Sequence, residues 1–287
     1  MRADFLRIAR MTIALRCDDP GLAWEWPGAS SRFLVPPATP DVELDLRAVD
    51  AIPPAQVSDL VFDSGAVWRL FRDGEGFRIE CHSDVFPANP YKAATFDASF
   101  THGTIVMSEG ARGLCPLDYP LDEVLVSHLL GRGRGVELHS CGVIDQQGRG
   151  HLFVGMSGAG KSTTARLWGS SAAAILSDDR VIVREEEDGM RMHGTPWHGE
   201  AALSMPASAP LAGVYLLEQS SQLALRELHR ADAVARLFGC SFPPFHDSES
   251  VAFTLAFLER LADRVPVREL RFTRDARVAD LILAEAA

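Results

Sequence analysis

The chain has 287 residues, of which 47% are hydrophobic and 23% are charged, so its composition is that of a folded globular protein. Acidic side chains outnumber basic ones by 39 to 28, which gives a formal net charge of −11 at pH 7. Because no basic block interrupts this excess, nucleic acid and anionic membrane surfaces are disfavoured as main partners. The length predicts about two domains.

The cysteines and the apolar runs indicate the compartment. Five cysteines, at positions 17, 81, 115, 141 and 240, include no CxxC pair, which argues against a disulfide framework and a thiolate zinc site. Charged residues interrupt every apolar run near the N-terminus, and apolar stretches elsewhere are too short to span a bilayer. We therefore expect a cytoplasmic protein without a membrane partner.

Residues 1–112 are predicted to form a smaller, β-rich N-terminal domain. Apolar runs at 67–72 and 77–81 flank the turn sequence D-G-E-G at 73–76, which is typical of a hairpin. Residues 104–108 form a further expected strand. The region contains no catalytic constellation, and it could contact a peptide or a second copy of the chain, so a homo-oligomer is an open alternative.

Residues 113–287 are predicted to form the larger α/β domain, because strands and helices alternate along them. We expect helices over residues 121–130, 162–168, 232–238, 247–263 and 275–286. We expect strands over residues 136–144, 151–154, 173–176, 181–184, 190–193, 214–217 and 267–272.

Residues 155–162 read G-M-S-G-A-G-K-S and fit the phosphate-loop pattern G-x-x-x-x-G-K-[ST] at every fixed position. Glycines let the backbone wrap around phosphate oxygens, and the following helix favours an anion at its start. Lys161, one of only two lysines in the chain, would reach the β- and γ-phosphates, and Ser162 would ligate Mg²⁺. The predicted nucleotide-binding residues are Gly155, Ser157, Gly158, Ala159, Gly160, Lys161, Ser162 and Thr163.

An acidic pair follows the next predicted strand. Asp178 lies 17 residues after Lys161, so only one helix and one strand fit between the loop and Asp178-Asp179. In a phosphoryl-transfer enzyme one carboxylate can hold Mg²⁺, while another accepts the proton of an attacking hydroxyl. A solvated turn is the alternative interpretation of an isolated Asp-Asp pair.

The order of these motifs resembles the catalytic domain of HPr kinase/phosphorylase. That family carries a histidine-bearing strand, a G-x-S-G-x-G-K-S loop, a helix, and an apolar strand that ends in Asp-Asp. Leu138-His139, residues 155–162 and residues 177–181 follow in the same order here. The resemblance covers roughly residues 120–280, with its specific part at 136–183, and is shared more distantly with phosphoenolpyruvate carboxykinase.

The resemblance implies a fold, an activity and roles for single residues. The fold is an α/β phosphate-loop kinase domain of the HPr kinase type, and the activity is ATP- and Mg²⁺-dependent phosphorylation of a serine or threonine hydroxyl on a peptide or small protein. Asp178 would be the general base, and Asp179 with Ser162 would hold Mg²⁺. His139 would lie near the phosphates with the catalytic Lys161, although a hydrogen-bonded strand histidine is an equal alternative.

The chain departs from the family after the acidic pair. The family's L-E-I-R-G-L-G run is absent, and residues 193–200, H-G-T-P-W-H-G-E, stand in its place. Glu200 is the candidate for the family's metal-proximal glutamate. The departure argues against HPr as acceptor and against a reverse reaction. The chain is more similar to the HPr-kinase-like proteins of ribosomal peptide modification, including lasso peptide kinases, which phosphorylate a serine of a small peptide.

The same departing segment allows other interpretations. His193 and His198 with Glu200 could form a metal site, although the intervening Gly, Thr and Pro break helical spacing. Trp197 could stack on a base or fill the core. The whole chain has two alternative functions: a small-metabolite kinase or carboxykinase-like enzyme, and a non-catalytic ATP-binding sensor. The first would phosphorylate a small molecule instead of a peptide. The second would bind ATP without turnover.

Overall fold

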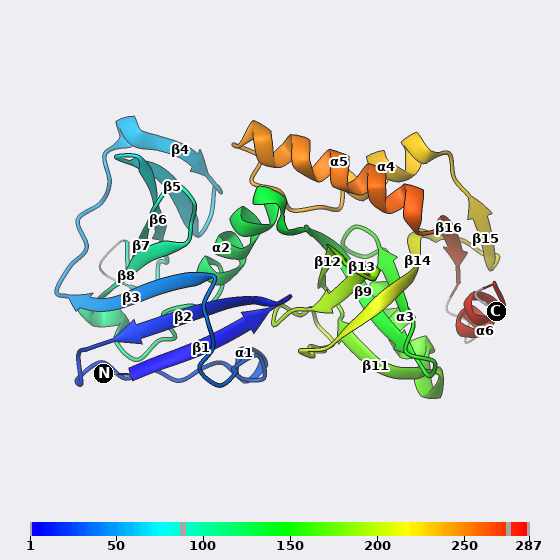
Figure 1. Ribbon diagram of the computed structural model, residues 1–287, viewed down its shortest axis with the longest axis horizontal. Coiled ribbons are helices and arrows are strands. Elements are labelled where there is room, and N and C mark those ends of the chain that lie inside the picture. The colour runs from blue at the N-terminus through cyan, green and yellow to red at the C-terminus, as the bar shows by residue number, and fades with distance from the viewer. Residues whose placement is uncertain (1, 87–89, 274–276, 286–287) are drawn as a thin grey trace. The chain divides into compact units, whose positions relative to one another are not determined.

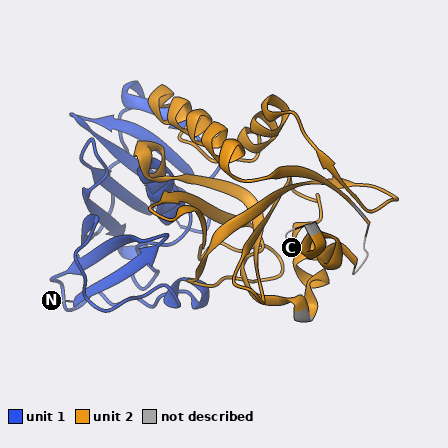
Figure 2. Cartoon of the chain, turned by 45° about the vertical axis from the view of Figure 1, so that its right-hand side comes forward, with its two compact units in different colours: residues 1–129 blue, residues 130–287 orange. Residues whose placement is uncertain are grey.

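The computed structural model describes residues 2–86, 90–273 and 277–285 (Figure 1). The protein is a mixed α/β structure with two large sheets and few helices. The chain divides into two compact units, residues 1–129 and 130–287 (Figure 2). The sequence places the boundary between residues 112 and 113 instead. The intervening segment includes helix α2 (Leu121–Leu129), which groups with the first unit.

The first unit is built on an eight-stranded sheet in the order β1-β2-β3-β8-β7-β6-β5-β4. The pairs β2–β3 and β3–β8 are parallel, and the other neighbours are antiparallel. The expected hairpin at 67–81 is confirmed as β5 and β6, and the expected strand at 104–108 as β8. The strands are β1 (Arg2–Ile8), β2 (Met11–Cys17), β3 (Val42–Val49), β4 (Leu60–Asp63), β5 (Trp68–Asp73), β6 (Gly76–Cys81), β7 (Lys92–Phe96) and β8 (His102–Ser108). A single helical turn, α1 (Gly28–Ser31), follows β2.

The hairpin between β1 and β2 has an unusual turn. Its two turn residues, Ala9 and Arg10, adopt φ values of 46° and 65°. Two-residue hairpins require such left-handed conformations and normally use Asn or Gly for them. The sequence therefore contains no turn signal at this position, although the β-rich character of the region was expected.

The second unit is built on strands in the order β10-β9-β12-β13-β14-β16-β15, with β11 paired to β9. Strand β10 also pairs in parallel with β14, so β9, β10, β12, β13 and β14 close into a ring. All strands expected after residue 130 are present, and β15 was not expected. The strands are β9 (Val136–Asp145), β10 (Gly150–Val154), β11 (Ala172–Ser177), β12 (Arg180–Glu186), β13 (Gly189–Gly194), β14 (Ser208–Gln219), β15 (Ala224–Glu227) and β16 (Val267–Phe272).

Strand β9 changes partners along its length. Residues 136–139 pair with β12, whereas residues 140–144 pair with β10 and residues 142–145 also with β11. His139 is the last residue of the β12-paired part and lies opposite Arg180 in the register. The strand thereby brings the end of β11, the start of β12 and the loop after β10 to one region of the second unit.

Helices cover both faces of this sheet (Figure 1). Side chains alternate along β10: Leu152 and Val154 pack in the core shared with α4 and α5, and Phe153 packs in the core shared with α3 and α6. The sheet is therefore buried on two sides. The helices are α3 (Lys161–Leu167), α4 (Arg230–Phe238), α5 (Ser248–Arg264) and α6 (Arg277–Glu285). Positions 275, 276, 286 and 287, three of which belong to the last expected helix, lie outside the described residues.

Two further observations bear on the expected compartment. Each of the five cysteines is a buried, free thiol. Within the described part of the chain, no helix has both the length and the apolar character needed to cross a bilayer. A cytoplasmic location stays a prediction.

Candidate functional site

The glycine-rich loop connects β10 to α3, as the motif requires. Gly158 and Gly160 adopt φ values of 79° and 107°, left-handed conformations in which any other side chain is strained. At Gly155, an added Cβ would lie 2.7 Å from the Cβ of Ala159, which is too close. Three of the loop glycines are therefore demanded by its backbone path.

Lys161 is buried beneath this loop, with a relative exposure of 6%. Its Nζ donates to the carbonyl oxygens of Gly155 at 3.0 Å and Met156 at 3.2 Å. An ammonium has three N–H donors, so one has no acceptor among the described residues. Burial lowers the pKa of Lys161, although the charge of Asp179 opposes this effect. An anionic ligand would therefore stabilise the charged form of Lys161.

Several loop amides are available to a ligand. The amides of Ser157, Gly158 and Gly160 have no acceptor among the residues that the structure describes. A residue outside the loop contacts its tip: the side-chain Nε2 of Gln219, at the end of β14, donates to the Gly158 carbonyl at 2.8 Å. Free backbone donors beside a buried ammonium form a suitable surface for phosphate oxygens.

The acidic pair forms the two-residue connection between β11 and β12. Ser177, the last residue of β11, fixes this turn: its hydroxyl oxygen accepts from the amides of Asp179 and Arg180, both at 3.1 Å. The Ser177 hydroxyl donates to the carbonyl of Trp197 at 2.9 Å. Ser177 is fully buried and is a structural residue that sequence reasoning gave no role.

Asp178 is buried, and its two carboxylate oxygens already accept four hydrogen bonds. Its Oδ1 accepts from the amides of Gly199 at 3.0 Å and Leu203 at 3.3 Å. Its Oδ2 accepts from the amide of Ala201 at 2.9 Å and from the hydroxyl of Ser162 at 3.2 Å. A carboxylate offers about four lone-pair positions. Asp178 therefore fastens the 199–203 turn to the start of α3.

Asp179 is more open, with its side chain 27% exposed. The Nε2 atom of His139 lies 3.0 Å from Asp179 Oδ1, and Nη1 of Arg180 donates to Asp179 Oδ2 at 2.5 Å. Burial alone would raise the pKa of Asp179, but the hydrogen bond of His139 and the charges of Arg180, His139 and Lys161 lower it. The carboxylate is thereby held in its ionised form.

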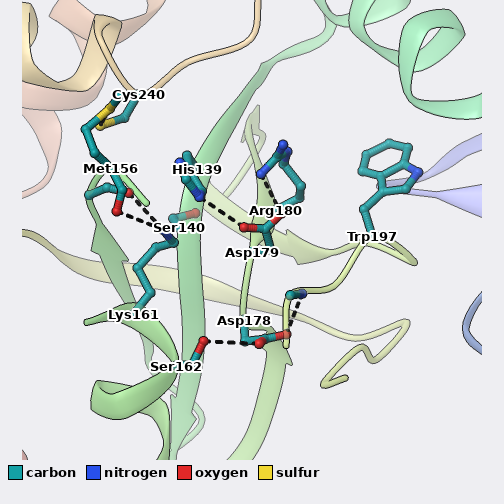
Figure 3. A network of polar contacts seen from close by, with 12 residues as sticks. His139, Ser140, Met156, Lys161, Ser162, Asp178, Asp179, Arg180, Trp197 and Cys240 are labelled. Atoms are coloured by element: carbon teal, nitrogen blue, oxygen red, sulfur yellow. Dashed lines mark hydrogen bonds and ion pairs between the residues drawn. The ribbon is translucent and has the colours of Figure 1, made fainter. Parts of the chain in front are cut away.

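The predicted site residues fall into two groups (Figure 3). Ser162 lies with Asp178, and His139 lies with Asp179 and Arg180. The sequence interpretation pairs Ser162 with Asp179 instead. Local spacing could not decide between two adjacent aspartates, because their side chains leave the turn in different directions.

The other predicted residues lie apart from these groups. Glu200 is exposed within the 199–203 turn, and its carboxylate makes no hydrogen bond or ion pair with any described residue. His193 Nε2 contacts Glu186 Oε1 at 3.0 Å, and His198 Nδ1 contacts its neighbouring carbonyl, of Gly199, at 3.0 Å. The contacts of the two histidines therefore give no support to a shared metal site with Glu200.

The donor set suits a magnesium ion that is shared with a nucleotide. No group of three or more His, Cys, Asp or Glu side chains in the described ranges is arranged to hold a metal on its own. Mg²⁺ is commonly held by one or two carboxylates together with substrate phosphates. Ser162 and Asp178, 3.2 Å apart, supply the hard oxygen donors that this arrangement needs.

Comparison of the chain with protein-family models gives no match, and comparison with curated proteins gives none either. The resemblance to HPr kinase/phosphorylase therefore rests on the motifs and their order. No family is assigned to the chain.

Proposed function

We propose that residues 130–287 form an ATP-dependent kinase domain of the HPr kinase type, which transfers the γ-phosphoryl group to a serine or threonine hydroxyl on a peptide or small protein. One observation carries the proposal. A loop with the full phosphate-binding motif and an acidic pair, separated by only one helix and one strand, meet at Ser162 and Asp178, 3.2 Å apart. The peptide acceptor comes from the family resemblance alone.

The nucleotide phosphates would bind at the loop. The free amides of Ser157, Gly158 and Gly160 would donate to phosphate oxygens, and the buried ammonium of Lys161 would offset their negative charge. Ser162 and Asp178 would hold Mg²⁺, which would neutralise charge on the β- and γ-phosphates. In this assignment the Ser162 hydroxyl turns its proton away from Asp178 Oδ2, which frees one lone pair of each oxygen for Mg²⁺ without movement of the backbone.

The contacts favour Asp179 rather than Asp178 as the general base, the reverse of the roles suggested by the sequence. Asp178 is 1% exposed, three of its four hydrogen bonds come from backbone amides, and the fourth position, held by the Ser162 hydroxyl, is the one assigned to Mg²⁺. An acceptor hydroxyl would therefore have to displace a backbone amide. Asp179 is partly exposed, and each of its oxygens has one contact with the residues that the structure describes, which leaves room for a hydroxyl proton. His139 then acts by orienting Asp179.

The proposed reaction is a direct in-line transfer. The acceptor oxygen forms a bond to the γ-phosphorus while the bond from that phosphorus to the β–γ bridging oxygen breaks. The proton of the acceptor hydroxyl moves to a carboxylate oxygen of Asp179, and the bridging electron pair leaves with ADP. No further oxidant, reductant or co-reactant is required.

The test is transfer of label from γ-labelled ATP in the presence of Mg²⁺. The acceptors offered are serine-containing peptides, the protein HPr and free serine, and Lys161→Ala is the control variant. We expect label on a peptide or protein, and its loss in the control. Label on free serine alone would contradict the peptide acceptor and support a metabolite kinase. ATP binding without transfer to any acceptor would contradict the kinase proposal and support a nucleotide sensor.

A further inference from the structure

The strongest feature that the proposed mechanism does not use is a bridge between two carboxylates. Arg180 is the first residue of β12 and follows the acidic pair directly. Its Nη1 donates to Asp179 Oδ2 at 2.5 Å, while its Nε lies 3.3 Å from Oε1 of Glu137. One planar guanidinium therefore forms a hydrogen bond with Asp179 and an ion pair, without hydrogen-bond geometry, with Glu137.

Glu137 is the inner end of this bridge. Its side chain is fully buried, and it lies on β9 two residues before His139. Residues two apart on a strand point to the same face, so Glu137 and His139 are on the same side of β9. A buried carboxylate is stable only with charged or hydrogen-bonding partners, and Arg180 supplies a positive charge to it.

A third contact fixes the plane of the guanidinium. The Arg180 Cζ lies 4.0 Å from the ring centroid of Phe242, a cation–π distance. Phe242 is itself tied to β9, because its amide donates to the Glu137 carbonyl at 3.2 Å. The segment after α4 thus covers the arginine and connects to the strand that carries Glu137 and His139.

We propose that Glu137 and Arg180 are positioning residues for Asp179, an inference that rests on the proposed kinase function. Without Arg180, His139 would hold only one carboxylate oxygen of Asp179, and the carboxylate could rotate about that contact. Arg180, held by Glu137 and Phe242, fixes the second oxygen. The Asp179 carboxylate then keeps one orientation relative to β9. A general base needs a fixed orientation to accept the proton of an acceptor hydroxyl.

The first test needs no catalysis. With ¹⁵N-histidine labelling, the hydrogen-bonded Nε2–H proton of His139 gives a downfield resonance, assigned by its absence in His139→Gln. We expect Arg180→Gln and Glu137→Gln to lose or shift this resonance, because Asp179 can then turn away from His139. Arg191→Gln is the matched control: Arg191 lies 3.3 Å from Glu186, another arginine–glutamate pair of this unit, and this variant should leave the resonance unchanged.

The second test is kinetic. We expect Arg180→Gln to lower kcat for phosphoryl transfer by about 10- to 100-fold, with the Kd for ATP unchanged. The double variant with Glu137→Gln should be no slower than Arg180→Gln alone, since the two residues act as one unit. Should Glu137→Gln fail to fold, Glu137→Asp keeps the charge, withdraws the carboxylate by one methylene and provides the same test.

The two tests separate the two proposals. A His139 resonance that is unchanged in Arg180→Gln would overturn the positioning role, whatever the protein phosphorylates. Single-variant effects that multiply in the double variant would also contradict it. If the wild type transfers no phosphate to any acceptor, the proposed function fails, while the resonance still decides whether Glu137 and Arg180 orient Asp179.

Discussion

The chain has only two lysines, one in each unit, and both are buried in different surroundings. Lys92, on β7 of the first unit, forms an ion pair with Asp118. Burial lowers the pKa of Lys92, but attraction to Cys81 and Asp118 outweighs burial and raises it. Lys161, in the second unit, is hydrogen-bonded to two backbone carbonyls and to no other group in the described part of the chain, and burial lowers its pKa.

The difference separates a structural cation from a ligand-binding one. Lys92 has its counter-charge within the fold, so its contacts are complete without a ligand. Among the described residues, Lys161 contacts carbonyl dipoles but no carboxylate, and three amides of the same loop have no acceptor. Variants of the aspartates beside each lysine should therefore affect stability in the first unit and phosphate transfer in the second.

The largest expected effect is on catalysis in the second unit. Asp179→Asn keeps the size of the side chain and one acceptor oxygen but removes the base, so we expect transfer to fall by about 100- to 10,000-fold. The measurement is single-turnover transfer from labelled ATP, with the unfolding midpoint recorded in parallel. Asp178→Asn should impair ATP·Mg²⁺ binding as well as transfer. Full activity of Asp179→Asn would exclude Asp179 as the base.

The next effect is on stability of the first unit. Asp118→Asn removes the charged partner of a buried ammonium, and we expect the free energy of unfolding to fall by about 3 kcal/mol. Denaturant unfolding measures this loss, and transfer by the folded fraction should be unchanged. The control is Lys92→Met, which removes the buried charge itself and leaves a carboxylate that is 32% exposed to solvent. A larger loss in the control than in Asp118→Asn would contradict this account.

The first unit should also lose stability at alkaline pH. Burial raises the pKa of Cys81 from 9.0 to about 11, and the pKa of Lys92 is raised above 10.5. Both groups keep their protons in the folded state at pH values where the unfolded chain releases them, so stability falls as pH rises. We expect Cys81 to contribute a loss of about 2 kcal/mol between pH 9 and 11. Unfolding free energies against pH test this, and a slope unchanged in Cys81→Ala would refute it.

The smallest expected effect concerns the tip of the phosphate loop. Gln219→Ala removes one hydrogen bond to Gly158, and we expect ATP to bind about fivefold more weakly because the loop is less fixed. Calorimetric titration gives the affinity. Gln222→Ala, in the segment that follows β14, is the matched control and should bind like the wild type. Equal affinities in both variants would show that the Gln219 contact does not organise the loop.

The sequence predicted those elements whose conformation depends on particular local residues, such as glycines in turns. The phosphate loop requires glycines at Gly158 and Gly160 for its left-handed residues, and the D-G-E-G turn sets the β5–β6 hairpin. The hairpin at Ala9 and Arg10 lacks such a signal, because its left-handed residues are not glycine or asparagine. That turn joins two strands that pair from Ile8 and Met11 outward, and Ala9 is buried, so it forms without a local sequence signal.

The roles within the site depend on contacts that spacing does not encode. Asp178 and Asp179 are adjacent, and only the amides of the 199–203 turn, about twenty residues later, show which of them is buried. Glu137 and Arg180 are brought together by the pairing of β9 with β12. Side-chain alternation along β9 predicts that Glu137 and His139 lie on the same face of the strand. That Arg180 is the partner of Glu137 can be seen only in the folded structure.

The most direct test of the account is calorimetric titration of ATP with Mg²⁺ into the wild type, Lys161→Ala and Lys92→Met. We predict that the wild type and folded Lys92→Met bind ATP alike. Lys161→Ala should show no binding at concentrations that saturate the wild type, because the buried Lys161 ammonium contacts no carboxylate within residues 2–86, 90–273 and 277–285. Equal binding by Lys161→Ala and the wild type, or no binding by the wild type, would contradict the assignment of residues 155–162 as a phosphate-binding loop.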